Sequence, residues 1–164
     1  MDANSQSTPM PDASLLQLLH EDLQTSQQLL ALLDEEFAAL QARDLHLLEK
    51  LLGSKQPLLA TLSQNAQVRS QTLHSLGHSP DATGWNAYLA GHAQAEDLAK
   101  ASQQLEQQLE QCRQANLRNG RLINANQASV GSLLGILRGA ETPSLYDSRG
   151  ATARIAQQRP LSQA

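Results

Sequence analysis

The sequence predicts an all-α protein: an antiparallel bundle of three long helices and one short helix, with coiled-coil-like packing. Leucines recur at alternating spacings of three and four residues, the pattern of helices that bury one face against other helices. Aromatic residues make up only 2% of the chain and β-branched residues are sparse, so a β-sheet would lack suitable side chains. The break between the first two patterned stretches is very short, which makes neighbouring helices antiparallel.

The composition limits the class of protein. A chain of 164 residues suffices for one domain with a moderate core, and a formal net charge of −4 argues against a general nucleic-acid binder. A single cysteine permits no internal disulfide, as in proteins of a reducing cytosol. The chain has neither an apolar run as long as a membrane span nor the features of a signal peptide. We therefore expect a cytoplasmic protein with no membrane insertion.

The first helix is expected from Ser14 to about Ala42, after a disordered leader over residues 1–13. The leader is small and polar and contains two prolines. Ser14 and Gln17 form the capping-box pattern that begins a helix. Eight positions form the stripe that we expect to be buried: Leu16, Leu19, Leu23, Ser26, Leu30, Leu33, Phe37 and Leu40.

A second helix is expected after Asp44, whose side chain can cap its N-terminus, and Gly77 ends it. Gly53 and Pro57 lie inside the pattern, but the register continues across them, so we expect a kink there rather than a break. The expected stripe is Leu45, Leu48, Leu52, Lys55, Leu59, Leu62, Ala66, Arg69, Leu73 and Leu76.

Charged residues in or near these stripes are interpreted as solvated. Lys55 and Arg69 fall on the second stripe, but their long apolar stems can cover a seam while the charge reaches water. Glu21-Asp22 and Glu35-Glu36 are assigned to the polar face of the first helix.

A short helix is expected after Ser79-Pro80-Asp81, with Trp85 and Tyr88 on one face. It would close one end of the bundle. We assign residues 14–138 to one helical bundle domain and residues 139–164, which have loop composition, to a flexible tail.

The third long helix, from about Ala93 to Arg138, changes character along its stripe. The stripe turns from apolar to amide side chains and then to aliphatic ones, and Gly131 and Gly135 each cost roughly 1 kcal/mol of helix stability relative to alanine. The part after Asn126 is therefore expected to be a conditional helix that needs a partner. The stripe is Leu98, Ser102, Leu105, Leu109, Cys112, Asn116, Asn119, Ile123, Asn126, Val130, Leu133 and Leu137.

No set of residues in the sequence predicts an enzyme. His74 and His78 are four residues apart, but a predicted helix end lies between them and no further ligand is fixed nearby, so we expect no metal site. Cys112 lies on the core stripe, which favours a small buried side chain over a nucleophile. We expect no catalytic residue and no cofactor.

Tyr146 lies in a tail of small and charged residues, where it has no core to join. Two interpretations stay open. Tyrosine is a common anchor in the pocket of a partner protein. Isolated exposed tyrosines are also ordinary on protein surfaces.

Motifs in both halves of the chain match a known pattern. The C-terminal half contains Asn116-x-x-Asn119-Gly120-x-Leu122-Ile123, Leu133-Leu134-x-Ile136-Leu137 and Tyr146-Asp147-x-x-Gly150. The N-terminal half contains Glu36-x-x-x-Leu40, then Asp44, and Lys55 followed by Leu58-Leu59 and Leu62. Over residues 14–150 this pattern resembles the FlgN-type flagellar export chaperone family.

The resemblance implies a cytoplasmic, ATP-independent chaperone of flagellar type III export. Such a chaperone holds the C-terminal helices of unassembled hook–filament junction (hook-associated) proteins and delivers them to the export apparatus. The resemblance implies that Tyr146 docks at the cytoplasmic domain of the export gate. It also implies client binding through the C-terminal amphipathic helix, which we expect to centre on Ile123, Val130, Leu133, Leu134 and Leu137.

An alternative of a different class remains. The same helices suit a structural coiled-coil adaptor or a homodimeric scaffold with no role in export, and self-association is left open. Binding of a junction-protein helix distinguishes the two, since only the chaperone requires it.

Overall fold

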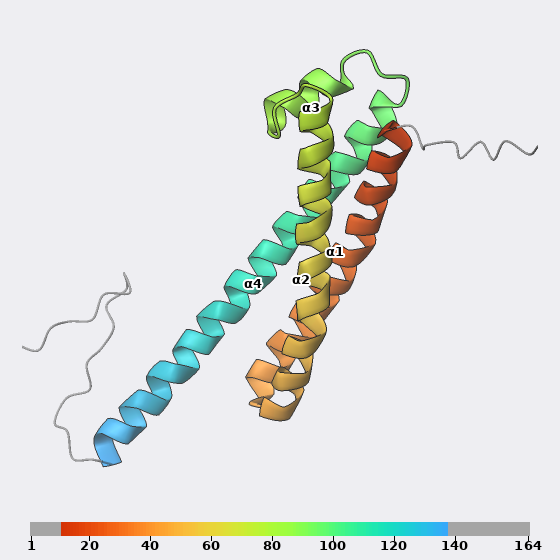
Figure 1. Ribbon diagram of the computed structural model, residues 1–164. Coiled ribbons are helices and arrows are strands. Elements are labelled where there is room, and N and C mark those ends of the chain that lie inside the picture. Colours follow the sequence, from red (N-terminus) through yellow and green to blue (C-terminus); the bar gives the residue numbers. More distant parts are fainter. Residues whose placement is uncertain (1–10, 138–164) are drawn as a thin grey trace, which may run out of the picture. The chain divides into compact units, whose positions relative to one another are not determined.

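The computed structural model describes residues 11–137, which form four helices and no strand (Figure 1). Helix α1 spans Pro11–Ala42, α2 spans Leu45–Ser75, α3 spans Ala82–Leu89 and α4 spans Ala95–Leu137. The predicted all-α class, with three long helices and one short one, is confirmed. The predicted tail lies outside the described residues.

The start of the first helix differs from the prediction. It begins at Pro11, three residues before Ser14, because proline fits the first helical position, where its missing N–H is not needed. The chain divides into two compact units, with the boundary in the sequence between Asn119 and Gly120. The first unit holds α1, α2, α3 and the first part of α4.

The turn between α1 and α2 takes two residues. Arg43 adopts a left-handed conformation, with φ of 56°, and the Asp44 amide donates to the Ala39 carbonyl at 3.0 Å, which closes the end of α1. The Asp44 carboxylate then accepts a hydrogen bond from the Leu47 amide at 3.0 Å, which confirms the predicted cap of α2. One residue thus ends one helix and begins the next.

Helix α2 continues without a break through Gly53 and Pro57. It ends at a left-handed Gly77, with φ of 80°, where the His78 amide donates to the Leu73 carbonyl and the Gly77 amide to the His74 carbonyl. This confirms the predicted stop.

The short helix α3 begins at a cap made by Asp81, whose carboxylate accepts a hydrogen bond from the Gly84 amide at 2.8 Å. Gly84 packs directly on the backbone of Ser79, and a Cβ at this position would overlap the Ser79 carbonyl. Only glycine therefore fits there, and the tight turn fixes the direction in which Trp85 and Tyr88 leave the helix.

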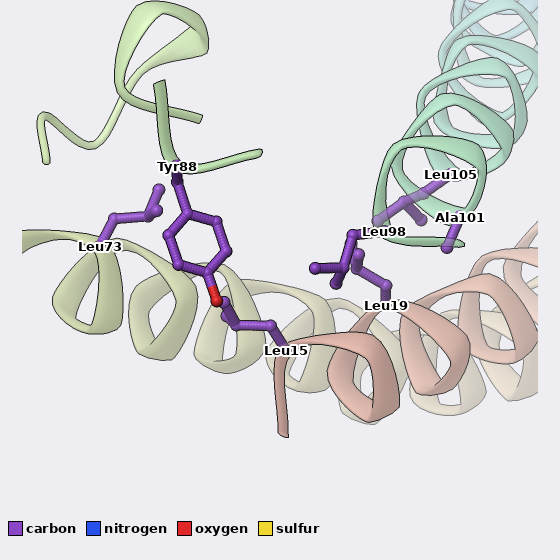
Figure 2. Close-up of a cluster of buried hydrophobic side chains, with 7 residues drawn as sticks. All are labelled: Leu15, Leu19, Leu73, Tyr88, Leu98, Ala101 and Leu105. Atoms are coloured by element: carbon purple, nitrogen blue, oxygen red, sulfur yellow. The ribbon is translucent and has the colours of Figure 1, made fainter. Parts of the chain in front are cut away.

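Among the residues that the structure describes, Tyr88 is the largest fully buried side chain, and it joins three helices. Figure 2 shows its ring between Leu73 of α2 and Leu15 of α1. Its faces and edge also meet the rings of His78 and His92 at centroid distances of 5.7 and 4.3 Å. The apolar cluster around it comprises Leu15, Leu19, Leu73, Tyr88, Leu98, Ala101 and Leu105. The short helix closes one end of this cluster, as predicted.

The buried stripes differ from the predicted ones by one residue at every second position. On α1 the buried positions, apart from Ala39, alternate by four and three residues: Leu15, Leu19, Asp22, Ser26, Leu29, Leu33, Glu36 and Leu40. Half of the predicted stripe is therefore correct, while Leu16, Leu23, Leu30 and Phe37 flank the seam and are only partly buried.

The other long helices repeat this one-residue difference. On α2 the predicted Leu45, Leu52 and Leu59 are exposed, at 78, 53 and 46%, and Leu51 and Asn65 are buried instead. On α4 the buried residues are Leu98, Ala101, Leu105, Cys112, Ala115 and Asn119, whereas Leu109 and Asn116 are exposed.

This register gives a matched pair of stability tests. Leu29 is 5% exposed and packs with Leu33, Cys112 and Ala115, so Leu29→Ala should lower the free energy of unfolding by about 2–4 kcal/mol. Leu30→Ala, one residue away and only partly buried, should cost distinctly less. Chemical denaturation of both variants measures the difference. A larger loss for Leu30→Ala would restore the register read from the sequence.

Two acids on the buried stripe of α1 pair with the two cations of α2. Asp22, which is fully buried, accepts hydrogen bonds from Asn65 at 2.9 Å and from the guanidinium of Arg69. The interpretation of Asp22 and Arg69 as solvated charges is therefore wrong. Asp22, Asn65 and Arg69 thus form a polar layer. Along α1 this layer lies between the Tyr88 cluster and a second apolar cluster, which comprises Leu29, Leu33, Cys112 and Ala115.

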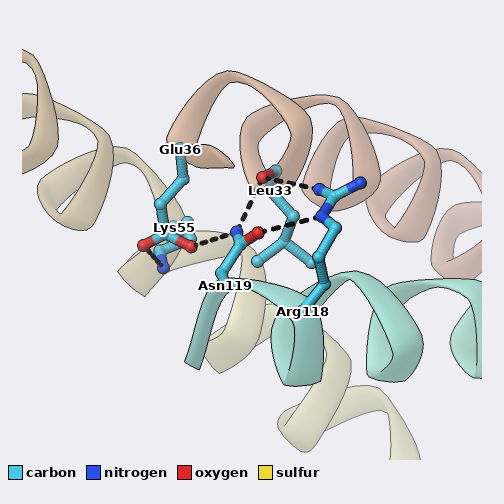
Figure 3. A network of polar contacts seen from close by, with 5 residues as sticks. All are labelled: Leu33, Glu36, Lys55, Arg118 and Asn119. Atoms are coloured by element: carbon cyan, nitrogen blue, oxygen red, sulfur yellow. Dashed lines mark hydrogen bonds and ion pairs between the residues drawn. The ribbon is translucent and has the colours of Figure 1, made fainter. Parts of the chain in front are cut away.

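The second polar layer lies around Glu36 and is drawn in Figure 3. Glu36 accepts hydrogen bonds from Lys55 of α2 and from the amide of Asn119 of α4, and Asn119 also donates to the Leu33 carbonyl at 2.7 Å. Glu36 is thus buried and paired rather than solvated. An amide stands on the stripe of α4 because Asn119 binds Glu36 of α1, and Glu36 in turn binds Lys55 of α2, so that the layer joins all three long helices.

Arg118 adds further contacts between α4 and α1 beside this polar layer. It donates to Asp34 at 2.9 Å and stacks over the Phe37 ring at 4.2 Å from the centroid. Among the described residues, every buried side-chain nitrogen and oxygen has a hydrogen-bond partner. Because such layers satisfy their polar groups only in one alignment, they fix the register of the helices.

Candidate functional site

The part of α4 in the second unit differs from the rest of the chain in its side chains. From Leu122 to Leu137 it contains no charged residue, while large aliphatic side chains recur along it. Several are exposed: Ile123 at 37%, Leu134 at 44%, Leu133 at 61% and Ile136 at 68%. Exposed aliphatic groups that lie together mark a surface that binds a partner, because water covers them at a cost in free energy.

Helical geometry gathers three of these four side chains on one side. At 3.6 residues per turn, Ile123, Leu133 and Leu134 fall within one stripe along the helix. The opposite side carries small residues, among them Ala125, Ala128, Gly131 and Ser132. The two sides of this segment therefore differ in side-chain size rather than in charge. Such a helix is suited to packing against another apolar helix.

The predicted binding residues fall as follows. Ile123, Leu133 and Leu134 lie on this stripe and are exposed, and Val130 and Leu137 lie in the same helix. Ile136, the most exposed of the described aliphatic residues in this segment, was not among them because it lies off the stripe, on the same side of the helix as Ala125. Tyr146 lies outside the described residues.

Cys112 is a buried core side chain, 6% exposed, as the sequence indicated. Burial raises the pKa of its thiol, so the sulfur stays protonated and donates a hydrogen bond to the Ser26 carbonyl at 3.3 Å. The Cys112 side chain thus packs between α1 and α4.

The two histidines near the end of α2 differ in their surroundings. His74 is exposed, whereas His78 packs its ring edge-to-face against Tyr88. Within residues 11–137, no three side chains of the metal-binding types lie close enough together to hold an ion. None of the helices over this range has both the length and the apolar character of a membrane span.

Fold and surface together define a class of protein: a helical bundle whose last helix continues as an uncharged stretch with exposed aliphatic side chains. The family model described as "FlgN protein" matches residues 10–154. A crystal structure of a flagella synthesis protein, FlgN, from Pseudomonas aeruginosa is similar over 76% of this chain and 96% of that chain, at 48% sequence identity and a TM-score of 0.64. The chain belongs to the FlgN family of flagellar assembly proteins. No curated protein matches it.

Proposed function

We propose that this protein is a cytoplasmic chaperone of flagellar type III export. It binds the C-terminal helices of hook–filament junction proteins before they assemble and delivers them to the export apparatus. The observation that supports this most is the uncharged segment of α4 with exposed Ile123, Leu133, Leu134 and Ile136. Membership of a family of flagellar assembly proteins narrows the partners to flagellar components.

The apolar stripe suits a client that is itself an amphipathic helix. Subunits that later pack in a filament carry apolar stripes, which would pair with one another before assembly. An aliphatic helix covers such a stripe by helix-to-helix packing, with a few large side chains as anchors. The absence of charge over Leu122–Leu137 means that no ion pair has to form or break when a client binds.

Release without ATP requires modest affinity. The binding segment contains Gly131 and Gly135, each of which lowers helix stability by roughly 1 kcal/mol relative to alanine. Part of the binding free energy is spent on holding this segment helical, so the client is held less tightly than its apolar area alone would give.

Calorimetric titration tests the proposal. The whole chain is titrated with a synthetic peptide that carries the C-terminal helix of a junction protein. We expect saturable binding with a Kd on the order of 1 µM, or about 8 kcal/mol, and a negative heat-capacity change from buried apolar surface. A scrambled peptide of the same composition should give no heat of binding. No binding of the helix, together with concentration-dependent self-association, would favour the scaffold instead.

Tyr146 is proposed to dock at the cytoplasmic domain of the export gate. It stands nine residues beyond the last described residue of α4, so client and gate would meet different parts of the chain. A chaperone that used one site for both would have to drop its client in order to dock.

This separation predicts how Tyr146→Ala behaves. Client affinity should stay within about twofold, or ~0.4 kcal/mol, while secretion of junction proteins and pull-down by the gate domain should fall. Tyr146→Phe, which keeps the ring, should retain most of the gate binding. Loss of client binding in Tyr146→Ala, or unchanged secretion and gate binding, would contradict the two-surface arrangement.

A further inference from the structure

The turn between α1 and α2 holds the chain in a conformation that its residues do not favour. Arg43 has a φ of 56°, in the left-handed region, which is more costly for a residue with a side chain than for glycine. Asp44 is the other residue of the turn, and it both closes α1 and caps α2. Short connections under strain favour the exchange of elements between copies of a chain.

The residues around this turn are suited to a helix. From Ala39 to Leu48 the sequence contains no glycine and no proline, and all of its residues except Asp44 and His46 are alanine, leucine, glutamine or arginine. Many helices end at a glycine, as α2 does at Gly77, but the end of α1 has none. The break between α1 and α2 therefore depends on the packing of α2 back onto α1.

The buried positions of the two helices are in phase across the turn. Leu40, the last buried residue of α1, and Leu51, the first of α2, are eleven residues apart, which is three helical turns to within about 20°. If the two helices joined into one, the buried positions from Leu15 to Leu73, apart from Ala39, would fall within one stripe about 100° wide. A hairpin does not require this agreement, because its turn can set the second helix at any rotation about its own axis.

The buried ion pairs are arranged about the same point of the chain. Two pairs are centred between residues 45 and 46: Asp22–Arg69 and Glu36–Lys55. Two antiparallel copies of a continuous helix, related by a two-fold axis at this point, would form each pair twice, with the acid from one copy and the cation from the other. The polar layers that fix the register of α1 on α2 within one chain therefore specify the same register between two chains.

We propose that two copies of this chain exchange their first helices to form a dimer. In each copy α1 and α2 join into one continuous helix over residues 11–75, and α1 packs in the first unit of the other copy, in the place of that copy's own α1. The contacts of the first unit are kept, except those of the turn. The exchange involves only the first unit, so it does not depend on the proposed export function.

The turn and the protein concentration set the balance between the two forms. The dimer relieves the left-handed conformation of Arg43, but it gives up the Asp44 cap of α2 and costs the translational freedom of one copy. Because the buried surfaces are the same in both forms, a substitution in the turn shifts the equilibrium directly. Each substitution acts twice in the dimer.

A distance measurement on the whole chain distinguishes the two forms. Gln28 and Ser63 are exposed and are centred on the same point as the ion pairs. The variant Gln28→Cys with Ser63→Cys, in which Cys112→Ala removes the native thiol, carries two spin labels and is refolded with an excess of unlabelled protein. In the hairpin the labels lie on neighbouring helices, about 25 Å apart or less, whereas in a continuous helix they lie about 52 Å apart. Pulsed electron paramagnetic resonance should show the longer distance, in a fraction that rises with protein concentration.

Two substitutions in the turn should shift the dimer in opposite directions. Arg43→Gly removes the strain of the hairpin and weakens the continuous helix, so it should raise the dissociation constant of the dimer by at least about 100-fold. Asp44→Ala removes a cap that only the hairpin needs, so it should lower that constant by at least about 10-fold. Both residues are exposed, so the core stays intact, and analytical ultracentrifugation measures the constants.

Three results would overturn the proposal. If only the short distance is found at every concentration, in the native chain and in Asp44→Ala, the helices do not exchange. If a dimer forms and keeps the short distance, it is an association of closed hairpins. If Arg43→Gly and Asp44→Ala have equal dissociation constants, the turn does not control the dimer.

Discussion

Arg69→Met should be among the most destabilising single substitutions in the chain, with a loss of about 3–5 kcal/mol in the free energy of unfolding. The reason is the position of its partner. Asp22 is 0% exposed, and removal of the guanidinium leaves a carboxylate in the core with only the Asn65 amide to bind it. A buried charge without its counter-ion loses its hydration and gains little in return.

A double substitution separates this cause from simple loss of side-chain packing. Asp22→Leu combined with Arg69→Met replaces both charges by apolar groups and should recover most of the loss, because no unpaired charge remains. Arg113→Met is the matched control, since the Arg113–Glu110 pair is exposed and should contribute little. Urea denaturation of the four proteins measures these differences. A loss below about 1 kcal/mol for Arg69→Met would mean that the Asp22 layer is not a structural element of the fold.

Leu133→Asp together with Leu134→Asp should abolish client binding, with a loss of affinity of at least about 100-fold, or ~2.7 kcal/mol. Both side chains are exposed in the free protein, so the changes should leave the thermal midpoint nearly unchanged. In the complex, each new carboxylate would be buried against an apolar client at a cost of several kcal/mol. Calorimetric titration with the junction-protein helix measures the affinity.

The opposite side of the same helix supplies a matched control. Ala125→Asp together with Ala128→Asp adds the same two charges within the same segment, but away from the aliphatic stripe. Binding should survive in this variant. Equal losses in both doubles would indicate that added charge simply melts the helix, and a large fall in the midpoint for the leucine variant would show that these leucines stabilise the fold.

The four helices and several of their ends could be predicted from the sequence because their causes are local. Asp44 caps α2, Gly77 ends it and Asp81 begins α3, each through backbone groups only a few residues away. The segment with exposed aliphatic side chains was also visible, since an uncharged stretch with aliphatic spacing and two internal glycines is a local property.

The register of the core was only half predicted, because an apolar stripe avoids charged positions and adjacent leucines do not distinguish one register from the next. The predicted stripe passes through Leu23 and Phe37, yet the adjacent acids Asp22 and Glu36 are buried and these two residues are only partly so. Their burial depends on partners on other helices, which no single stripe reveals.

The spacing of the charged residues on α1 and α2 indicates the observed register. Asp22 and Glu36 are two heptads apart on α1, and Lys55 and Arg69 are two heptads apart on α2. When two helices run antiparallel, the first acid meets the second cation and the second acid meets the first, as the structure has it. Asn119 could not be assigned in this way, because its partners come from α1 and its place depends on packing of all three helices.

Hydrogen exchange tests the central claim most directly, namely that the aliphatic segment of α4 is the client-binding surface. Amide protection is followed along the whole chain, with and without a saturating junction-protein helix. The account predicts new protection over residues 122–137, where a marginally stable helix becomes ordered by its client, and little change in α1 and α2. New protection confined to α1, α2 or α3, with residues 122–137 unchanged, would contradict it.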